Sequence, residues 1–456
     1  MRNTDTPITH TEGEANRSRR RREWRARNRH AASDKLLARD AAAFLHQSLS
    51  SPCLSTVAKA EGIWIEDIAG RRYMDFHGNS VHHIGYGHPK LIAAIKRQLD
   101  QLSFAPRRFT CEPAVELAEE LGRLAPAGLS KALFTTGGSD ANEVALKIAR
   151  AATGRFKTVS FWDAFHGAGF GAASVGGEET FRSHIAGPLL PGAEHVAPFA
   201  CYRCPYGHSG PEVCRLACAN MVRYVLEKEG DAAAVIAEPM RAVPYVPPPG
   251  FWQEVRRACD DCGALLIFDE IPTGLGKTGK FFAFEHDEVV PDIVVLGKAL
   301  GGGVLPIAAV VARTELDVCG DFAIGHYTHE KNPVTARAAL TTLEIIREEG
   351  LVERAAELGA HALGRMSDLA ARAPCVGDVR GRGLMFGLDI VSDKAARTPD
   401  SDEAERIYYA CLEAGLSVKI SQGSVLTLSP PLIIAKADLD RALDIVENAV
   451  LGNRSG

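Results

Sequence analysis

Charged residues follow two short apolar runs in the middle of the chain, and their types could do chemistry together. Asp269 and Glu270 come directly after the run 265–268. Lys298 follows the run 293–296 after a single glycine. Such runs are typical of buried parallel strands, and open α/β sheets place their working groups beyond the carboxyl ends of strands. We therefore predict that an acid and a desolvated, nucleophilic amine meet at one ligand, although a purely structural buried ion pair would give the same pattern.

A second motif, KALFTTGGSDANEVALKIAR, spans residues 131–150. It predicts a strand that ends at two glycines, with Ser139 as the N-cap of an amphipathic helix beginning at Asp140. The free backbone N–H groups at such a helix start form a phosphate site. The same strand, glycine turn and helix also make ordinary α/β connections.

The pattern DE…TG.G.TGK…PDI…LGK.LGGG at residues 269–303 resembles the class III aminotransferase family, pyridoxal 5'-phosphate (PLP) enzymes of fold type I. The resemblance implies that Lys298 binds the cofactor covalently. It also implies that Asp269 pairs with the pyridine nitrogen and keeps it protonated, so that the ring accepts electrons.

Further cofactor contacts are implied by the same resemblance. The segment at 136–143 is similar to the family's SG(S/T)EANE, which assigns phosphate contacts to Gly138 and Ser139. The aromatic-His-Gly sequence assigns ring stacking to Phe165, which His166 follows. Glu238 would reach the substrate side of the cofactor, and Thr328 would bind the phosphate across the interface of a homodimer. These residues, with Asp269 and Lys298, make up the implied cofactor site.

Departures from the family pattern bear on the reaction. Thr427 stands where the family's R-x-x-PPL arginine often grips the carboxylate of an amino-group acceptor, and a hydroxyl cannot replace that bidentate contact. In GHYTHEKNP, at 325–333, charged residues replace aromatic and glycine residues, and Pro272 replaces a frequent glutamine. Stretches such as YMDFHGNSVH and HYTHEKNP are similar to a lyase branch, the (R)-1-hydroxy-2-aminoethylphosphonate ammonia-lyases. An aminotransferase that uses another arginine is the alternative.

Substrate contacts are predicted from loops. The segment 77–89 is rich in glycine, histidine and asparagine and lines the active-site mouth in the resembled family, which makes candidates of Asn79 and His82. Arg107 and Arg108 follow a proline and can hold an anionic group, or they are surface arginines. Lys331 adds charge close to the implied site.

Composition narrows the classes of partner. The formal net charge of -5, with 46% hydrophobic residues, gives no general case for nucleic acid or anionic membranes. The eight arginines at 17–29 are either a nucleic-acid-binding arm or, as we favour, the solvated face of a helix or an oligomer-clasping arm. Eleven cysteines without an export signal favour reduced thiols and a cytoplasmic location. The C-x2-C and C-x3-C pairs at 201–218 match zinc spacing, but we expect no metal because the domain needs no metal staple.

The expected fold class is α/β, with a large mostly parallel-sheet domain and a smaller α+β domain built from both termini. Strands at 131, 158, 232, 264, 292 and 306 alternate with helical patterns, which is typical of one sheet covered on both faces. We predict an N-terminal arm and small-domain segment at 1–70, a PLP-binding domain at 71–325 and a C-terminal small domain at 326–456.

Overall fold

The computed structural model describes residues 18–183 and 186–452, and its centre is a seven-stranded sheet in the order β4-β10-β9-β8-β7-β5-β6. Strands β5 to β9 run parallel, and β10 is antiparallel to both of its neighbours. The strands are β4 Leu129–Thr135, β5 Lys157–Phe161, β6 Ala193–Val196, β7 Ala232–Ala237, β8 Leu265–Asp269, β9 Ile293–Leu296 and β10 Ala308–Arg313. The sequence predicted six of these strands and missed β6.

Helices cover both faces of this sheet because consecutive strand residues point to opposite sides. Ile267 packs in a core cluster with residues of α5, whereas Leu266 and Phe268 pack in the cluster that contains residues of α10. The run in β8 is therefore apolar throughout, as expected for a strand buried on two sides. The large-domain helices are α3 Pro89–Gln101, α4 Glu112–Leu124, α5 Gly138–Thr153, α6 Phe170–Val175, α7 Glu179–Arg182, α8 Pro211–Cys214, α9 Ala217–Glu229 and α10 Phe251–Cys262.

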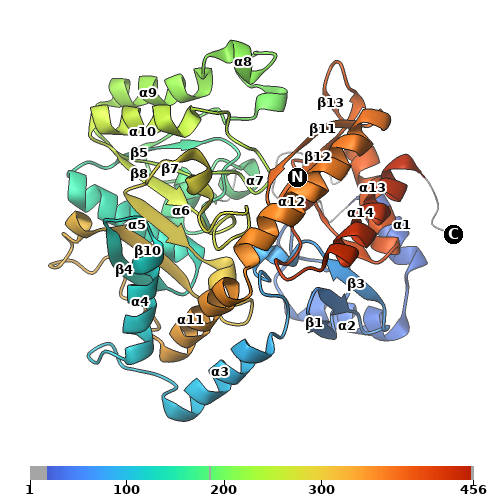
Figure 1. The fold of residues 1–456 in the computed structure, drawn as a ribbon, viewed down its shortest axis with the longest axis horizontal. Coiled ribbons are helices and arrows are strands. Elements are labelled where there is room, and N and C mark those ends of the chain that lie inside the picture. The colour runs from blue at the N-terminus through green and yellow to red at the C-terminus, as the bar shows by residue number, and fades with distance from the viewer. Residues whose placement is uncertain (1–17, 184–185, 453–456) are drawn as a thin grey trace.

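The smaller domain combines the two ends of the chain, as the blue and red segments of Figure 1 show. One sheet has the order β1-β2-β3-β14 and the other β11-β12-β16-β15, with β13 paired to β12. β3 lies between β2 and β14, so the first sheet extends beyond residue 70. The strands are β1 Lys59–Glu61, β2 Trp64–Glu66, β3 Arg72–Asp75, β11 Val376–Arg382, β12 Met385–Asp393, β13 Thr398–Pro399, β14 Leu416–Ser417, β15 Lys419–Ser421 and β16 Val425–Leu428.

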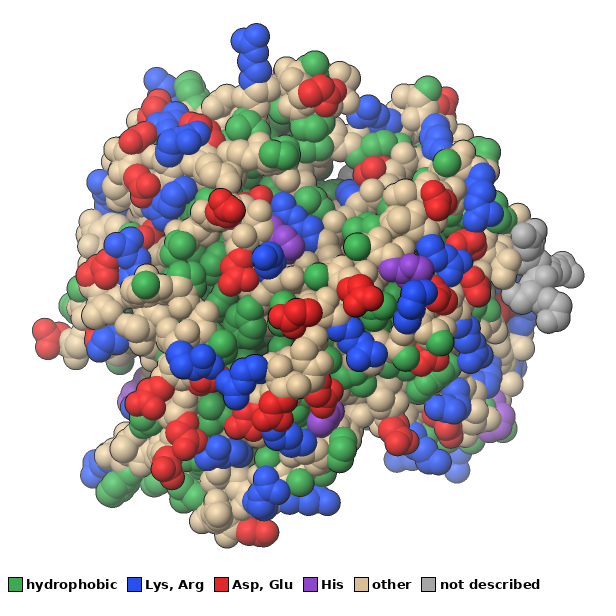
Figure 2. Space-filling view, viewed as in Figure 1, with side chains coloured by type: hydrophobic (Ala, Val, Ile, Leu, Met, Phe, Trp, Pro, Cys, Tyr) green, Lys and Arg blue, Asp and Glu red, His purple; other side chains and the backbone are tan. Residues whose placement is uncertain are grey.

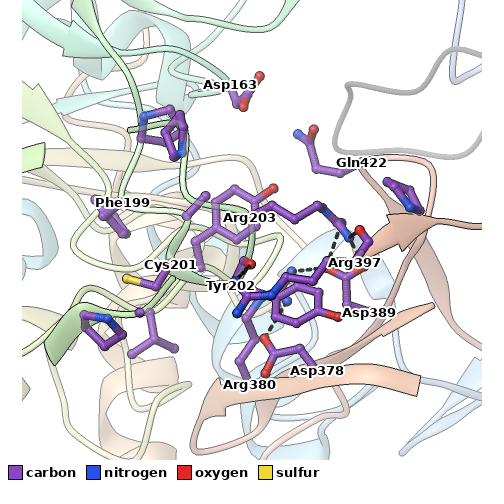
Figure 3. Close-up of a pocket in the computed structure, with 18 of the residues that line it drawn as sticks. Asp163, Phe199, Cys201, Tyr202, Arg203, Asp378, Arg380, Asp389, Arg397 and Gln422 are labelled. Atoms are coloured by element: carbon purple, nitrogen blue, oxygen red, sulfur yellow. Dashed lines mark hydrogen bonds and ion pairs between the residues drawn. The ribbon is translucent and has the colours of Figure 1, made fainter. Parts of the chain in front are cut away.

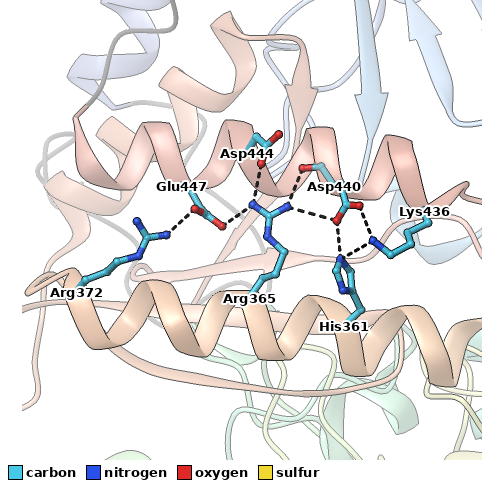
Figure 4. Close-up of polar contacts among 7 residues, drawn as sticks. All are labelled: His361, Arg365, Arg372, Lys436, Asp440, Asp444 and Glu447. Carbon is cyan, nitrogen blue, oxygen red and sulfur yellow. Dashed lines mark hydrogen bonds and ion pairs between the residues drawn. The ribbon is translucent and has the colours of Figure 1, made fainter.

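Two long helices, α11 (Pro333–Glu348) and α12 (Leu351–Arg372), lead from the large domain into the smaller one. α13 (Ser401–Glu413) and α14 (Lys436–Leu451) complete the smaller domain. Arg365 of α12 donates to Asp444 at 2.7 Å and to Glu447 at 2.6 Å, both on α14 (Figure 4). Several charges meet in this network, so it contributes more to the stability of the fold than an isolated surface ion pair would.

Part of the arginine-rich segment forms helix α1 (Arg19–Arg27), which packs against α13. Trp24 is buried and lies 6.2 Å from the ring of Tyr409. Arg20 pairs with Asp402 and Arg27 pairs with Glu413. These contacts support the helical interpretation of the run. Arg17 lies outside the described residues.

The surface in Figure 2 has blue and red side chains interspersed across the molecule. No helix in the described part of the chain combines the length and apolar character that crossing a membrane requires.

Candidate active site

Asp269 ends β8 and is 2% exposed. Its Oδ2 accepts a hydrogen bond from Asn142 Nδ2 at 2.9 Å and lies 2.8 Å from His166 Nδ1, while Oδ1 accepts from the backbone N–H of Ile271 at 3.1 Å. These three contacts hold the carboxylate in one orientation. Asn142 also donates to the carbonyl oxygen of His166 at 2.7 Å, so its amide fixes both partners.

Lys298 begins a short 3-10 turn, η5 (Lys298–Gly301), directly after β9. Its φ of +45° lies in the left-handed region, which non-glycine residues seldom adopt. Strained backbone of this kind gathers at functional sites, where the surrounding structure holds it. The neighbouring Gly297 is tightly packed: a Cβ there would lie 3.3 Å from Cγ1 of Ile271, so that side chain would have to move slightly to admit it.

The start of α5 lies against the same isoleucine. A Cβ at Gly138 would lie 2.5 Å from Cδ1 of Ile271, so glycine lets the helix start approach the ends of β8 and β9 closely. The predicted N-cap was wrong by two residues: Gly137 is the N-cap and the helix begins at Gly138. Ser139 instead lies in the first turn, where its Oγ accepts from the N–H of Ala168 at 3.1 Å. The helix still presents the free N–H groups on which the phosphate prediction rests.

A cavity of about 210 Å³ lies between the two domains next to Lys298. Its apolar lining is Phe76, Phe165, Ala242 and Met385, and its polar lining is His77, Asn79, Ser80, Lys298, Lys419, Thr427 and Ser429. Asn79 and Ser80 have φ values of +46° and +58°, so the loop that presents them is also strained. No arginine lines this cavity in the described part of the chain.

Glu238 follows β7 and is buried with Arg241. Arg241 Nη1 donates to Glu238 Oε1, and its Nη2 lies 3.3 Å from Glu178 Oε1. The backbone N–H of Ala242 donates to the second Glu238 oxygen at 3.0 Å. The two carboxylates and the guanidinium thus form a fixed buried group beside a cavity-lining residue. Sequence analysis did not single out Arg241 as the partner of Glu238, although it stands only three residues further along the chain.

Several predicted residues lie apart from this cavity. His82 is fully buried, with its Nε2 2.9 Å from the carbonyl oxygen of Asp75, and burial lowers its pKa to about 4. It therefore lies behind the cavity wall as a neutral side chain, rather than in the cavity as we expected. Arg107 and Arg108 are exposed on a turn and are not among the lining residues. Lys331 is exposed and lines a separate cavity of about 690 Å³.

Thr328 is exposed in the single chain. Tyr327 beside it donates from its hydroxyl to the carbonyl oxygen of Asp140 at 3.4 Å, so the loop lies next to the start of α5. An exposed hydroxyl at this place is open to a second subunit. The contribution of Thr328 across an interface stays a prediction.

Two other notable clusters lie away from Lys298. One is a cavity of about 580 Å³ in which Arg203 pairs with Asp389 and Arg380 with Asp378 (Figure 3). The four cysteines Cys201, Cys204, Cys214 and Cys218 line a hollow of only about 10 Å³. Within the described residues, all eleven cysteines are free, and no group of three or more His, Cys, Asp or Glu side chains is arranged to hold a metal.

Glu270 provides a test of the electrostatics beside the site. Its carboxyl accepts from Thr273 Oγ1 at 2.9 Å and from the N–H of Phe284 at 3.0 Å, and burial raises its pKa to about 7. The folded state then binds a proton that the unfolded state has released, so this group lowers the free energy of unfolding as pH rises from about 4.5 to 7. A shift of this size corresponds to roughly 3 kcal/mol.

We expect Glu270→Gln to remove this part of the pH dependence. The free energy of unfolding of both proteins should be measured with denaturant between pH 4.5 and 8. As the pH rises, the value for the wild type should fall by roughly 3 kcal/mol relative to the value for the variant. The isosteric amide keeps the size of the side chain, so differences of packing stay small. Parallel pH profiles would contradict the assignment, because they would mean that Glu270 is already ionised at low pH.

The residues at the site fit the cofactor that the sequence resemblance implies. A buried carboxylate with two fixed neighbours, an amine on a strained turn, a ring at Phe165 and a helix start converge at one end of the sheet. This donor set suits a protonated ring nitrogen, an aldehyde and a phosphate.

Comparison with known proteins agrees with this arrangement. The family model for class-III aminotransferases matches residues 46–450. The chain is 41% identical to an (R)-1-hydroxy-2-aminoethylphosphonate ammonia-lyase of Vibrio splendidus (strain 12B01), over 96% of this chain and 95% of that protein. It is 39% identical to a leucine/methionine racemase of Thermococcus litoralis, over 89% and 92% of the two chains.

Among solved structures, the fold is similar to an amine transaminase from an uncultivated Pseudomonas species in its PLP-bound form. The TM-score is 0.84 and the identity 32%, over 90% of this chain and 99% of that one. The chain thus has relatives with lyase, racemase and transaminase names, and its own architecture is the predicted fold type I. With its family model, its relatives and its site in agreement, the chain belongs to the class III aminotransferase family of PLP-dependent enzymes.

Proposed function

We propose that this enzyme is an ammonia-lyase that converts 1-hydroxy-2-aminoethylphosphonate to phosphonoacetaldehyde and ammonia. The observation that carries the proposal is the cavity beside Lys298, which has Thr427 and a second lysine in its lining but no arginine among the described residues. A 2-oxo acid acceptor lacks a bidentate clamp there, and a lyase requires no acceptor. The ammonia-lyase that matches over almost the whole chain supports the same reaction.

PLP, when bound, supplies an aldehyde for the substrate amine and a ring that accepts electrons. In this proposal Lys298 first holds the cofactor, and its freed ε-amine then takes a proton from the amine-bearing carbon of the substrate. Asp269 keeps the ring nitrogen protonated, and Asn142 and His166 hold that carboxylate in place. The hydroxyl leaves the neighbouring carbon as water, with the proton that Lys298 has taken up. Hydrolysis of the resulting enamine consumes one water and gives phosphonoacetaldehyde and ammonia, so the reaction balances without an oxidant.

The other proposed contacts have distinct roles. Gly138 and Ser139 bind the phosphate through the start of α5, and Phe165 stacks on the ring. We propose that Glu238, with its charge balanced by Arg241, acts from the substrate side through its position next to the cavity-lining Ala242. We propose a homodimer in which Thr328 of each subunit reaches the phosphate of the other.

The reaction should be tested with the purified holoenzyme and 1-hydroxy-2-aminoethylphosphonate, with no 2-oxo acid present. We expect ammonia and phosphonoacetaldehyde in equal amounts over many turnovers, with cofactor absorbance restored after each. An aminotransferase would instead stop after one turnover with the cofactor in its amine form. Turnover that begins only after addition of pyruvate or 2-oxoglutarate would contradict the lyase and favour that second function.

A further inference from the structure

Lys419 and Thr427 lie opposite each other on two strands of the smaller domain. β15 pairs antiparallel with β16, and the register places Lys419 against Thr427. The next pair, Ile420 and Leu426, is 3% and 0% exposed and packs in the core. Directly opposed residues share a face of the sheet and alternate with their neighbours. The Lys419 and Thr427 side chains therefore occupy the other face, where both line the cavity.

Hydroxyl side chains line the same cavity as this lysine. Thr427 donates from its hydroxyl to Ser421 Oγ at 3.1 Å, and Ser429 lines the cavity two residues after Thr427. An ammonium group and neighbouring hydroxyls are donors that suit a tetrahedral oxyanion such as a phosphonate. Lys298 lines the same cavity from the large domain, so its ε-amine and the donors that suit an anion come from opposite domains.

The cavity, with a volume of about 210 Å³, has to accommodate the cofactor as well as the substrate. Phe165 and Lys298 line the part that we assign to the cofactor. The wall of Lys419 and Ser429 remains for a small compound with an amine at one end and an anionic group at the other. Arg107, Arg108 and Lys331, the anion-binding residues expected from the sequence, are all outside this lining.

We propose that Lys419, together with the Ser429 hydroxyl, binds the anionic group of the substrate and thereby sets its specificity for small aminophosphonates. This inference rests on the proposed function and adds to it the residues that hold the phosphonate. A lysine ammonium binds phosphate-like oxyanions as a point charge, without the fixed bidentate geometry that an arginine fork requires. The lysine therefore binds and orients the substrate while the chemistry takes place at Lys298.

Lys419→Met in the full-length holoenzyme tests the subsite. We expect KM for 1-hydroxy-2-aminoethylphosphonate to rise about 10- to 100-fold with a much smaller change in kcat, because the charged hydrogen bond is lost. Lys419→Arg should recover part of the loss. Lys436→Met changes an exposed lysine on α14 that pairs with Asp440, and it should leave both constants unchanged. Cofactor absorbance and the melting temperature show whether each variant is folded.

Binding of methylphosphonate, measured by calorimetry, separates this inference from the proposed reaction. Methylphosphonate carries the anionic group without the amine, so its affinity for the wild type should exceed its affinity for the Lys419→Met variant by at least about 10-fold. That result supports the subsite even if the wild type proves to be an aminotransferase. Equal affinity of the two proteins, or no binding to the wild type, would overturn it. A loss seen in Arg107→Met or Arg108→Met but not in Lys419→Met would instead assign the anion to the turn.

Discussion

Lys298→Ala should reduce ammonia release from 1-hydroxy-2-aminoethylphosphonate on the order of 10³-fold or more. The variant loses the ε-amine that we propose both holds the cofactor and moves the substrate proton, and general acid-base catalysis alone contributes 10²- to 10⁴-fold. Lys298 lies on a left-handed turn between β9 and buried glycines, so a neighbouring side chain cannot take its place. Initial rates at saturating substrate, with PLP added in excess, measure the effect.

Lys280→Ala is the matched control, because Lys280 belongs to the same 269–303 pattern but is exposed. It should retain the wild-type rate. A small primary amine such as methylamine should restore a fraction of the activity of Lys298→Ala, since the missing group is a base. Activity of Lys298→Ala within about 10-fold of the wild type would show that another residue moves the proton.

Asp269→Asn should lower kcat by about 10²- to 10³-fold, the range found when a preorganised electrostatic contact is removed from a site. The substitution keeps the shape but removes the negative charge that we propose holds a proton on the ring nitrogen. It also replaces an acceptor between two close neighbours, Asn142 Nδ2 and His166 Nδ1, with a group that can present N–H to both. The cofactor absorbance should shift together with kcat, which a general loss of stability would not cause.

Asp292→Asn is the control for this experiment, because it removes a buried negative charge elsewhere in the sheet. Asp292 is also buried, but it precedes β9 at the opposite edge, where it pairs with Arg256 and Arg313. Its amide variant should lower the melting temperature and leave kcat of the folded enzyme within a few-fold of the wild type. Equal losses of kcat in both variants would contradict a specific role for Asp269.

The order of elements around Lys298 was readable from the sequence because each signal is local. An apolar run of strand length that stops at a charged residue fixes where the strand ends, and the parallel sheet then brings those ends to one edge. Asp269 at the end of β8 and Lys298 after β9 follow directly from this rule. The six predicted strands were found for the same reason, whereas β6 is short, half-exposed and lacks such a run.

The contacts made by single side chains required the tertiary structure. His82 shares the loop of Asn79, yet the loop turns it toward Asp75 and away from the cavity. Arg107 and Arg108 satisfy the chemistry of an anion site but lie on an exposed turn. A loop sequence gives the residue types available and not the direction in which each one points.

The contacts that sequence analysis did not predict join residues that lie far apart in the chain. Asn142 reaches Asp269 across 127 positions, and Lys419 enters the cavity of Lys298 from the other domain. The sequence by itself determined the family pattern, the strand ends and the residues available for cofactor chemistry. The tertiary structure decided which side chains face the substrate, because that depends on strand register and domain packing, which local sequence does not encode.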